Sequence, residues 1–442
     1  MAGTIVGSQS ENIFDVRIDE KLPYGQLFML GLQNVFGMTG MFVFPGIMGR
    51  AFNLPPTQIA YLYGMTFIVC GVVTILQSVV LLRLPIIQGP YAGSFASLLA
   101  VGHLQNGGLG AAYGSFFVAA LIWCVLSVPI RGVSVIGLFA RFLRAPLISS
   151  MIVIFIMLQI SNVALPGWIG LPQSPGFPYV NIFSGLLAVA VLIAVSVWGG
   201  SFRRAAILIA LVVGTAAYAL SRPVSLAAVA SAPILVTPKL FPFGFAVQTN
   251  LVIVFLLVLL PASVGSMALY QMVGEWDKQT VTPARMSQGV FAIGLGGVLA
   301  GALGGFSTIV YPDNVGMLRT TRIGSRYATL AAGVLLIVLG GCIKFDMLLV
   351  VVPLPVLSAA ATVLFGIVLM HGVQMLAKVE WDDRRFIVSG LAMLVALGGM
   401  FLPPEVLNQM PLITKLIVTQ PVIIGGVILV VLYSLLCRTV HR

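Results

Sequence analysis

Two interruptions in otherwise apolar stretches of this sequence hold most of the side chains that could bind a polar solute. The interruptions lie at 85–93 and 304–314, and their candidate binding residues are Gly89, Tyr91, Ala92, Phe306, Tyr311, Asp313 and Asn314. Each contains a proline, Pro90 or Pro312, which removes a backbone donor and clashes with the preceding helical turn. We therefore expect unwound or extended backbone at both places.

Asp313 is the acidic residue best placed to do chemistry. The other eleven of the 12 Asp and Glu residues fall in tails, loops or the ends of predicted helices. An acid inside a membrane is costly and marks a functional site. Asp313 would accept hydrogen bonds from N–H groups of a solute, or take up the coupling proton. The alternative is a structural carboxylate that pairs with Arg319 or lies at a helix start, where the dipole favours negative charge.

Amides and aromatic rings complete the set of candidates. Gln33 and Asn34 offer donors and acceptors together, as recognition of a planar heterocycle requires. Interhelical hydrogen bonding is the alternative role for this pair. Tyr91 would stack on a flat ring or close a helix interface. Phe306 and Tyr311 are aromatic partners across the proposed cavity, although most aromatic residues here serve packing.

Other chemistries find little support. His, Cys and carboxylate residues show no metal-ligand spacing, and no GxxxxGK[ST] loop for ATP occurs. No nucleophile is placed with a base, so an intramembrane enzyme is disfavoured. We expect no catalytic residue, no metal and no cofactor. The gradient of an ion, or of the solute itself, would supply the energy for transport.

The composition is that of a membrane protein. Hydrophobic residues make up 59% of the 442 positions and charged residues 8%, where a soluble domain carries about 25% charged residues. The windows 27–44, 59–82 and 251–269 are free of charge and long enough to cross roughly 30 Å of hydrocarbon. The net charge of +11 reflects the bias of membrane loops rather than a nucleic-acid partner.

Loop charges give the topology. We predict fourteen spans, near 26–48, 57–82, 85–103, 111–130, 143–165, 180–200, 204–221, 247–273, 285–304, 306–321, 325–342, 347–372, 384–402 and 417–437. With the N-terminus inside, 18 of the 23 Lys and Arg residues are cytoplasmic and 5 are not, as the positive-inside rule requires. We expect a multi-pass protein of a cell inner or plasma membrane, with both termini in the cytoplasm.

The two interruptions occupy corresponding places in the two halves of the chain. A shift of about 221 residues, half the length, carries the first span onto the eighth and Pro90 to within a few residues of Pro312. Because seven spans is an odd number, the second half must be inverted. Paired interrupted segments in inverted halves indicate the midplane site of a transporter. Ordinary proline kinks are the alternative.

Five stretches match motifs of one family. They are Leu22-Pro23-Tyr24-Gly25-Gln26, Gly31-Leu32-Gln33-Asn34, Asp313-Asn314-Val315-Gly316-Met317-Leu318-Arg319-Thr320-Thr321-Arg322, Gly324-Ser325-Arg326-Tyr327 and Val352-Pro353-Leu354-Pro355-Val356. The third contains the pattern acid-Asn-x-Gly-x-x-x-x-Thr-Arg. With these motifs the chain resembles the nucleobase–ascorbate transporter family, which includes bacterial uracil and xanthine permeases, over nearly its whole length.

This resemblance implies an all-α membrane fold of two inverted seven-span repeats, with short strands in spans three and ten. It divides the chain into a cytoplasmic tail (1–25), a core domain (26–142 and 247–342) and a gate domain (143–246 and 343–442, including a short C-terminal tail). It also implies a homodimer and symport with H⁺ or Na⁺. Substrate would bind between the strands, with Asp313 contacting the base and Asn314 supporting it.

The chain departs from the family pattern at three places. Ala262 stands where the family carries a Glu that binds the base and is tied to proton coupling, so Ser263 and Ser266 would offer hydroxyls instead. Asn34 replaces a His. The strand at 89–93 begins Gly-Pro, as in a divergent purine-permease-like branch.

The leading hypothesis is a secondary transporter of a purine, a pyrimidine or a related planar heterocycle, working by alternating access. An anion carrier of the sulfate or bicarbonate type is the first alternative, because it would bind its anion at facing half-helix ends. A carrier of another organic solute and a receptor without transport stay open.

Overall fold

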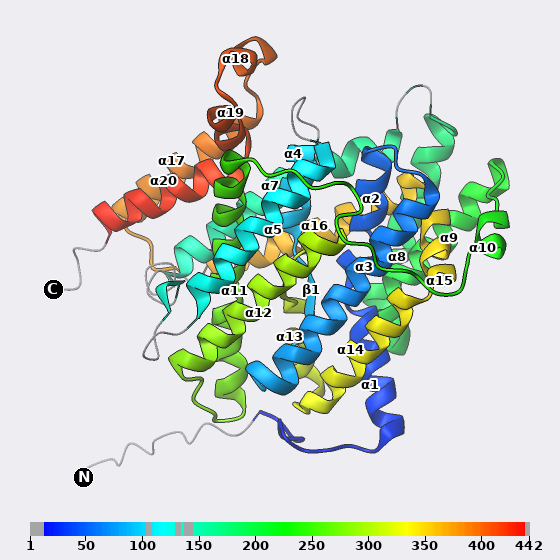
Figure 1. Cartoon of the computed structure of the whole chain (residues 1–442), viewed down its shortest axis with the longest axis horizontal. Coiled ribbons are helices and arrows are strands. Elements are labelled where there is room, and N and C mark those ends of the chain that lie inside the picture. The colour runs from blue at the N-terminus through cyan, green and yellow to red at the C-terminus, as the bar shows by residue number, and fades with distance from the viewer. Residues whose placement is uncertain are drawn as a thin grey trace.

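Long apolar helices form the protein, because in lipid a helix satisfies its own backbone hydrogen bonds. The computed structural model describes residues 13–102, 108–128, 134–136, 145–170, 172, 174–377 and 379–437. Seven of the described helices are long and apolar enough to cross a membrane, or eight if one bent pair counts as a single span. The result is the bundle in Figure 1.

The first half follows the predicted spans closely. Its elements are α1 (Tyr24–Phe36), η1 (Thr39–Phe42), α2 (Phe44–Ala51), α3 (Pro56–Ile75), the π-helix η2 (Leu76–Leu81), β1 (Gln88–Pro90), α4 (Ala92–Gly102), α5 (Gly108–Ser127), α7 (Pro146–Ile169), α8 (Tyr179–Trp198), η3 (Gly200–Ala205) and α9 (Ala206–Ser221).

The second half repeats the order of long helices, a strand and a half-helix. Its elements are α10 (Ala227–Ser231), α11 (Thr249–Trp276), α12 (Pro283–Leu303), β2 (Thr308–Val310), α13 (Pro312–Thr321), α14 (Arg326–Gly341), α15 (Ile343–Val351), α16 (Leu354–Leu376), α17 (Asp383–Met400), α18 (Pro404–Gln409), α19 (Leu412–Thr419) and α20 (Pro421–Leu436). Each of the fourteen predicted spans overlaps one or more of these elements.

Three predicted spans are less regular than expected. The first bends by 63° between α1 and the helix that follows. The twelfth, predicted over 347–372, is broken: α15 ends at Val351 and α16 begins at Leu354, because the residue before Pro353 is disfavoured in a helix. The last divides into α19 and α20, and Pro421 occupies the first turn of α20, where its missing N–H costs nothing.

Small residues let α3 and α14 approach closely. A Cβ atom at Gly71 would lie 2.6 Å from the Gly333 carbonyl oxygen, and one at Gly64 would lie 2.6 Å from the Gly340 oxygen. In each helix the two glycines are seven residues apart and therefore share a face. We call these four residues the glycine seam.

The division of the chain into a core domain and a gate domain stays a prediction.

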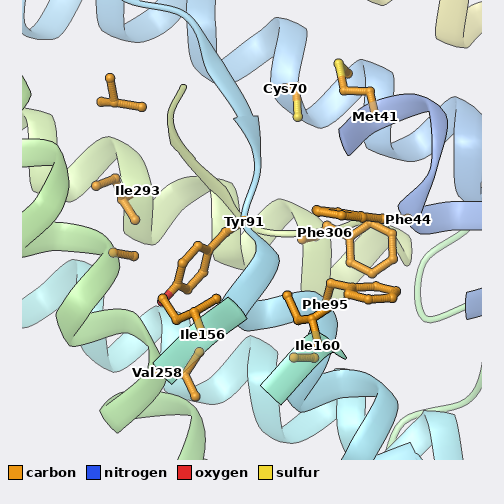
Figure 2. Close-up of a cluster of buried hydrophobic side chains, with 14 of the residues drawn as sticks. Met41, Phe44, Cys70, Tyr91, Phe95, Ile156, Ile160, Val258, Ile293 and Phe306 are labelled. Carbon is orange, nitrogen blue, oxygen red and sulfur yellow. The ribbon is translucent and has the colours of Figure 1, made fainter. Parts of the chain in front are cut away.

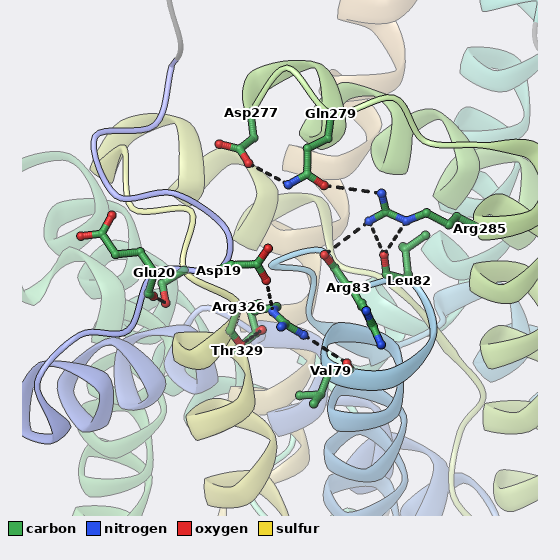
Figure 3. Close-up of polar contacts among 11 residues, drawn as sticks. Asp19, Glu20, Val79, Leu82, Arg83, Asp277, Gln279, Arg285, Arg326 and Thr329 are labelled. Atoms are coloured by element: carbon green, nitrogen blue, oxygen red, sulfur yellow. Dashed lines mark hydrogen bonds and ion pairs between the residues drawn. The ribbon is translucent and has the colours of Figure 1, made fainter.

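The predicted N-terminal tail is packed against the bundle from residue 13 onward. Phe14 is 4% exposed, and its ring meets Trp276 edge-on at 6.0 Å. Val16 forms a parallel bridge with Ile323. Asp19 pairs with Arg326 at 2.7 Å, as Figure 3 shows. We call residues 13–22 the N-terminal strap; residues 1–12 lie outside the described part of the chain.

Further charged and polar side chains lie beside the N-terminal strap at the same end of the bundle (Figure 3). Asp277, which also pairs with Arg17 of the strap at 3.4 Å, accepts a hydrogen bond from Gln279. Arg285 donates to the Leu82 carbonyl at 2.6 Å. The strap thus joins the ends of α11, α13 and α14 to one polar network.

The Phe14→Ala variant is expected to destabilise this end of the protein. Removing a buried aromatic ring costs about 3–5 kcal/mol, so the thermal unfolding midpoint of the purified protein should fall clearly. Tyr24→Ala is the matched control, because Tyr24 is 92% exposed and its loss should change stability by at most about 0.5 kcal/mol. Equal midpoints for the two variants would show that the strap does not stabilise the fold.

Candidate solute-binding site

The two interrupted stretches meet inside the bundle, as predicted. β1 and β2 pair antiparallel, with Gln88 opposite Val310 and Pro90 opposite Thr308. The pairing continues past the strands: the Tyr91 N–H donates to the Ser307 carbonyl at 2.8 Å. These bonds satisfy the backbone that the two prolines would otherwise leave unpaired.

A half-helix begins directly after each strand. α4 starts at Ala92 and α13 at Pro312. Since the strands are antiparallel, the two helices leave the pair in opposite directions, and both N-termini lie at the strand pair. The first N–H groups of a helix lack partners within it and carry a partial positive charge. The centre of the bundle therefore presents two helix ends suited to electron-rich oxygen atoms.

Buried polar atoms without a hydrogen-bond partner gather at the strand pair. Within the described residues they are Gln88 Oε1, Tyr91 OH, Ser307 Oγ, Thr308 Oγ1 and Asn314 Oδ1. Each of these side chains is at most 2% exposed. A buried polar atom left unpaired costs about 1–3 kcal/mol, so such a concentration indicates a place where another molecule completes the bonds.

A network of hydrogen-bonded amides and hydroxyls anchors β1 to α3, η2 and α11. The Gln88 N–H donates to Thr74 Oγ1 at 2.9 Å, and the Gln88 side chain donates to Gln77 Oε1. Gln77 in turn donates to the Tyr270 hydroxyl at 2.5 Å, which donates to the Gly289 carbonyl at 3.1 Å. Gln77 lies in the π-helix η2, a distortion frequent at functional sites.

Gln77 and Tyr270 were not among the residues predicted from the sequence. Both are polar side chains in the middle of an apolar span, and that isolation is the signal that could have found them. Both are fully buried, so their hydrogen bonds fix the position of Gln88 and of β1.

Residues of α11 support the other strand. Ser266 Oγ accepts a hydrogen bond from the Val310 N–H at 3.4 Å. Ser263 Oγ accepts one from Trp123 Nε1 at 3.0 Å. Ala262, in the place of the family's acid, is fully buried. In this conformation both hydroxyls thus hold protein groups in place.

The amide pair of the first span contacts α13. Asn314 Nδ2 donates to Asn34 Oδ1 at 2.9 Å, and Asn34 Nδ2 donates to the Leu30 carbonyl at 2.8 Å. Gln33 donates to Met317 Sδ. The bonds of Asn314 and Gln33 join α1 to α13, the interhelical alternative that the sequence left open, whereas the Asn34–Leu30 bond lies within α1. Asn314 Oδ1 is left available to a solute.

The aromatic candidates differ in their contacts. Phe306 is fully buried and meets Phe44 and Phe95 edge-on at 6.2 and 5.7 Å, so its role here is packing. The Tyr311 hydroxyl accepts the Gly40 N–H at 2.8 Å. Tyr91 lies in the buried cluster of Figure 2 with residues of α7 and α11.

Asp313 is placed by its backbone only. It is the second residue of α13, three positions after the strand residue Val310, so it belongs to the half-helix end that meets the strand pair. Its side chain lies outside the described part of the structure. Its predicted roles in binding and in coupling stay predictions.

Paired strands between two half-helices, buried in a bundle of apolar helices, define a multi-pass membrane carrier. The sequence model of the xanthine/uracil permeases, described as a permease family, matches residues 25–405. The chain belongs to the xanthine/uracil permease family, as its motifs indicated; it is a membrane transporter of the nucleobase permease family and not an enzyme.

Named relatives align over nearly the whole chain. The uric acid permease PucJ of Bacillus subtilis (strain 168) is 28% identical, over 91% of this chain and 90% of PucJ. The xanthine permease of the same organism is 25% identical, over 92% of this chain and 93% of that permease. The uric acid transporter UacT of Escherichia coli (strain K12) is 26% identical, over 94% and 86% of the two chains.

Solved structures share the fold. The transmembrane domain of the cyanobacterial bicarbonate transporter BicA has a TM-score of 0.58 at 14% identity, over 94% of this chain and 99% of that domain. The murine anion transporter Slc26a9 in its inward-facing state has a TM-score of 0.59 at 12% identity, over 94% of this chain and 69% of that one. The architecture is therefore the inverted repeat of seven plus seven spans.

Proposed function

We propose that this chain carries a purine nucleobase of the xanthine or uric acid type across the membrane by alternating access. The observation that carries the proposal is the group of unpartnered buried polar atoms at the strand pair. Amide and carbonyl-type oxygens accept from ring N–H groups, and hydroxyl groups donate to ring carbonyls. An oxidised purine presents both kinds of group in one plane, and the named relatives carry such purines.

We further propose H⁺ or Na⁺ symport, a homodimer, movement of the core domain against the gate domain, and cytoplasmic termini. These proposals rest on the family resemblance and on the loop charges. A pyrimidine or another planar heterocycle is the nearest alternative within the same reading.

An anion carrier is the second candidate. The shared fold with BicA and Slc26a9 and the two half-helix ends favour it, because helix N-termini bind anions without a carboxylate. Asp313 counts against an inorganic anion, since an ionised carboxylate at the same helix end would repel a compact negative charge, whereas a neutral oxidised purine such as xanthine is not repelled.

A thermal-shift screen of the purified protein tests the proposal. Xanthine or uric acid should raise the unfolding midpoint, because a ligand at 100 times its Kd stabilises the folded state by about 2.7 kcal/mol. Uracil, hydantoins, sulfate, bicarbonate and dicarboxylates complete the panel. The Tyr91→Phe variant, which removes one unpartnered hydroxyl, should weaken purine binding roughly tenfold.

The matched control is Tyr218→Phe, because the Tyr218 hydroxyl donates to the Pro175 carbonyl on an exposed surface. This variant should bind purines as the wild type does. A midpoint that rises with bicarbonate or sulfate and not with any purine would assign the protein to the anion carriers. Purine binding without uptake into proteoliposomes would indicate a receptor.

A further inference from the structure

A second carboxylate, Asp346, is buried away from the strand pair. It lies in the first turn of α15, the short helix that joins α14 to α16. Its side chain is 0% exposed, and within the described residues neither carboxylate oxygen has a hydrogen-bond partner. From the sequence, Asp346 was predicted to lie in a loop or at a helix end, so its burial was not expected.

The glycine seam makes room for this carboxyl group. A Cβ atom at Gly64 of α3 would lie 2.7 Å from Asp346 Oδ2 and 2.6 Å from the Gly340 carbonyl oxygen. Any larger residue at position 64 would displace the acid. The carboxyl group therefore occupies a space that exists only while α15 lies against α3.

The neighbouring basic group is engaged elsewhere. Arg50 of α2 donates from Nη2 to the Val350 carbonyl at 2.8 Å and also to the Val352 carbonyl, at the far end of α15. Among the described ion pairs, none joins Arg50 to Asp346. Arg50 Nη2 thus caps α15, Nη1 has no hydrogen-bond partner among the described residues, and no described ion pair reaches the acid.

Other titratable groups near α15 are neutral or half-exposed. The Tyr63 hydroxyl of α3 donates to the Phe42 carbonyl at 3.0 Å. Cys342 and Lys344, which flank the start of α15, are both half-exposed. The segment before α11 bonds to the same region through the Leu235–Cys342 bridge, and its charged residue, Lys239, is exposed.

A buried carboxyl group without a hydrogen-bond partner favours its neutral, protonated form, because burial removes the water that stabilises the negative charge. Burial raises the pKa of Asp346 to about 9, so the acid holds a proton at neutral pH while α15 is packed. When α15 leaves α3 and water reaches the carboxyl group, the pKa should return to about 3.9.

We propose that Asp346 is a proton-binding site and that α15 packs against α3 only while the proton is bound. A proton needs the carboxyl group alone, whereas a metal cation needs several oxygen ligands. α15 connects α14, a predicted core helix, to α16, a predicted gate helix. Proton release at Asp346 would detach α15 from α3 and so allow the two predicted domains to move relative to each other. This inference does not depend on which solute is carried.

The sign of the pH dependence follows from linkage. The packed state binds the proton more tightly than the open state does, so packing is favoured at low pH and is progressively lost as the pH rises between about 4 and 9. Over that window each pH unit should change the opening equilibrium about tenfold.

Hydrogen exchange of the full-length protein in lipid nanodiscs tests the proposal. The protection factors of the α15 amides, corrected for the intrinsic pH dependence of exchange, should fall about tenfold per unit from pH 6 to pH 9. In Asp346→Asn, a neutral group of the same shape, protection of α15 should stay constant over the same range. The control Glu405→Gln, which alters an exposed acid in the first turn of α18, should behave as the wild type.

Two outcomes would overturn the proposal. Wild-type protection of α15 that does not change between pH 6 and pH 9 would show that packing is not linked to a proton, whatever the variants do. A pH dependence in Asp346→Asn equal to that of the wild type would assign the proton to another group. Purine binding is measured separately, so failure of the proposed function leaves this result readable.

Discussion

Replacing Gly89 with alanine is expected to reduce purine binding and uptake by about 5- to 150-fold, the equivalent of the 1–3 kcal/mol that overpacking costs. The added Cβ would lie 2.1 Å from Cδ2 of the Tyr311 ring. The ring cannot easily turn away, because its hydroxyl is bonded to the Gly40 N–H at 2.8 Å. Either that bond or the pairing of Gly89 with Ile309 must give way, and both shape the site.

The measurement is uptake of labelled purine into proteoliposomes, with the thermal-shift assay for binding. Gly390→Ala is the control: Gly390 lies on the exposed face of α17, and a Cβ there meets nothing within 4 Å. It should transport as the wild type does. Normal transport by Gly89→Ala would mean that the strand pair tolerates an added methyl group and does not form a tightly fitted site.

Replacing Asp313 with alanine is expected to abolish transport while leaving a folded protein in the membrane. The residue lies in the first turn of α13, directly after the strand that pairs with β1, and an acid at this depth is costly unless it is used. Asp313→Asn separates its two proposed roles. If Asp313 only accepts hydrogen bonds, the amide keeps partial binding; if it takes up the coupling proton, solute exchange survives and uphill accumulation is lost.

Asp383→Ala is the matched control, since Asp383 is an exposed acid in the first turn of α17. Fluorescence-detected size-exclusion chromatography should give the same monodisperse peak for the wild type and each variant. Full uptake by Asp313→Ala would remove this acid from the mechanism.

The correspondence between the two halves of the chain and the proline positions predicted the central architecture. Pro90 and Pro312 have no N–H to donate and interrupt two apolar stretches in corresponding places, and the interrupted stretches form the paired strands. This prediction succeeded because backbone that cannot pair within a helix must pair elsewhere inside a membrane. The family resemblance implied short strands in the same two spans.

The polar surroundings of the strands were harder to predict. Gln77 and Tyr270 are isolated polar residues in apolar spans, and only the packing of three helices shows that they hold Gln88. For Ser263 and Ser266, sequence suggested contact with a solute, whereas the structure gives both hydroxyls protein partners. Which partner a hydroxyl chooses depends on tertiary contacts that a single sequence does not encode locally.

Burial of Asp346 was the largest omission. Its position near the end of a predicted span placed it in water, because distance from a span boundary was the only measure of depth. The structure folds the boundary back as α15, and Gly64 of a distant span provides the space for the acid. A carboxylate opposite a glycine on another helix leaves no pattern in the sequence around it.

The contacts of the N-terminal strap affect the order in which the protein folds during its synthesis at the ribosome. Glu20 accepts a bond from Ser325, a partner 305 positions later, and at about 5–20 residues per second the partner appears roughly 15–60 seconds afterwards. The strap's other partners, Trp276 and Asp277, are also made late, more than 250 positions after the strap residues that contact them. Attachment of the strap is therefore a late step in biosynthesis, which must wait until α11 and α13 have been made.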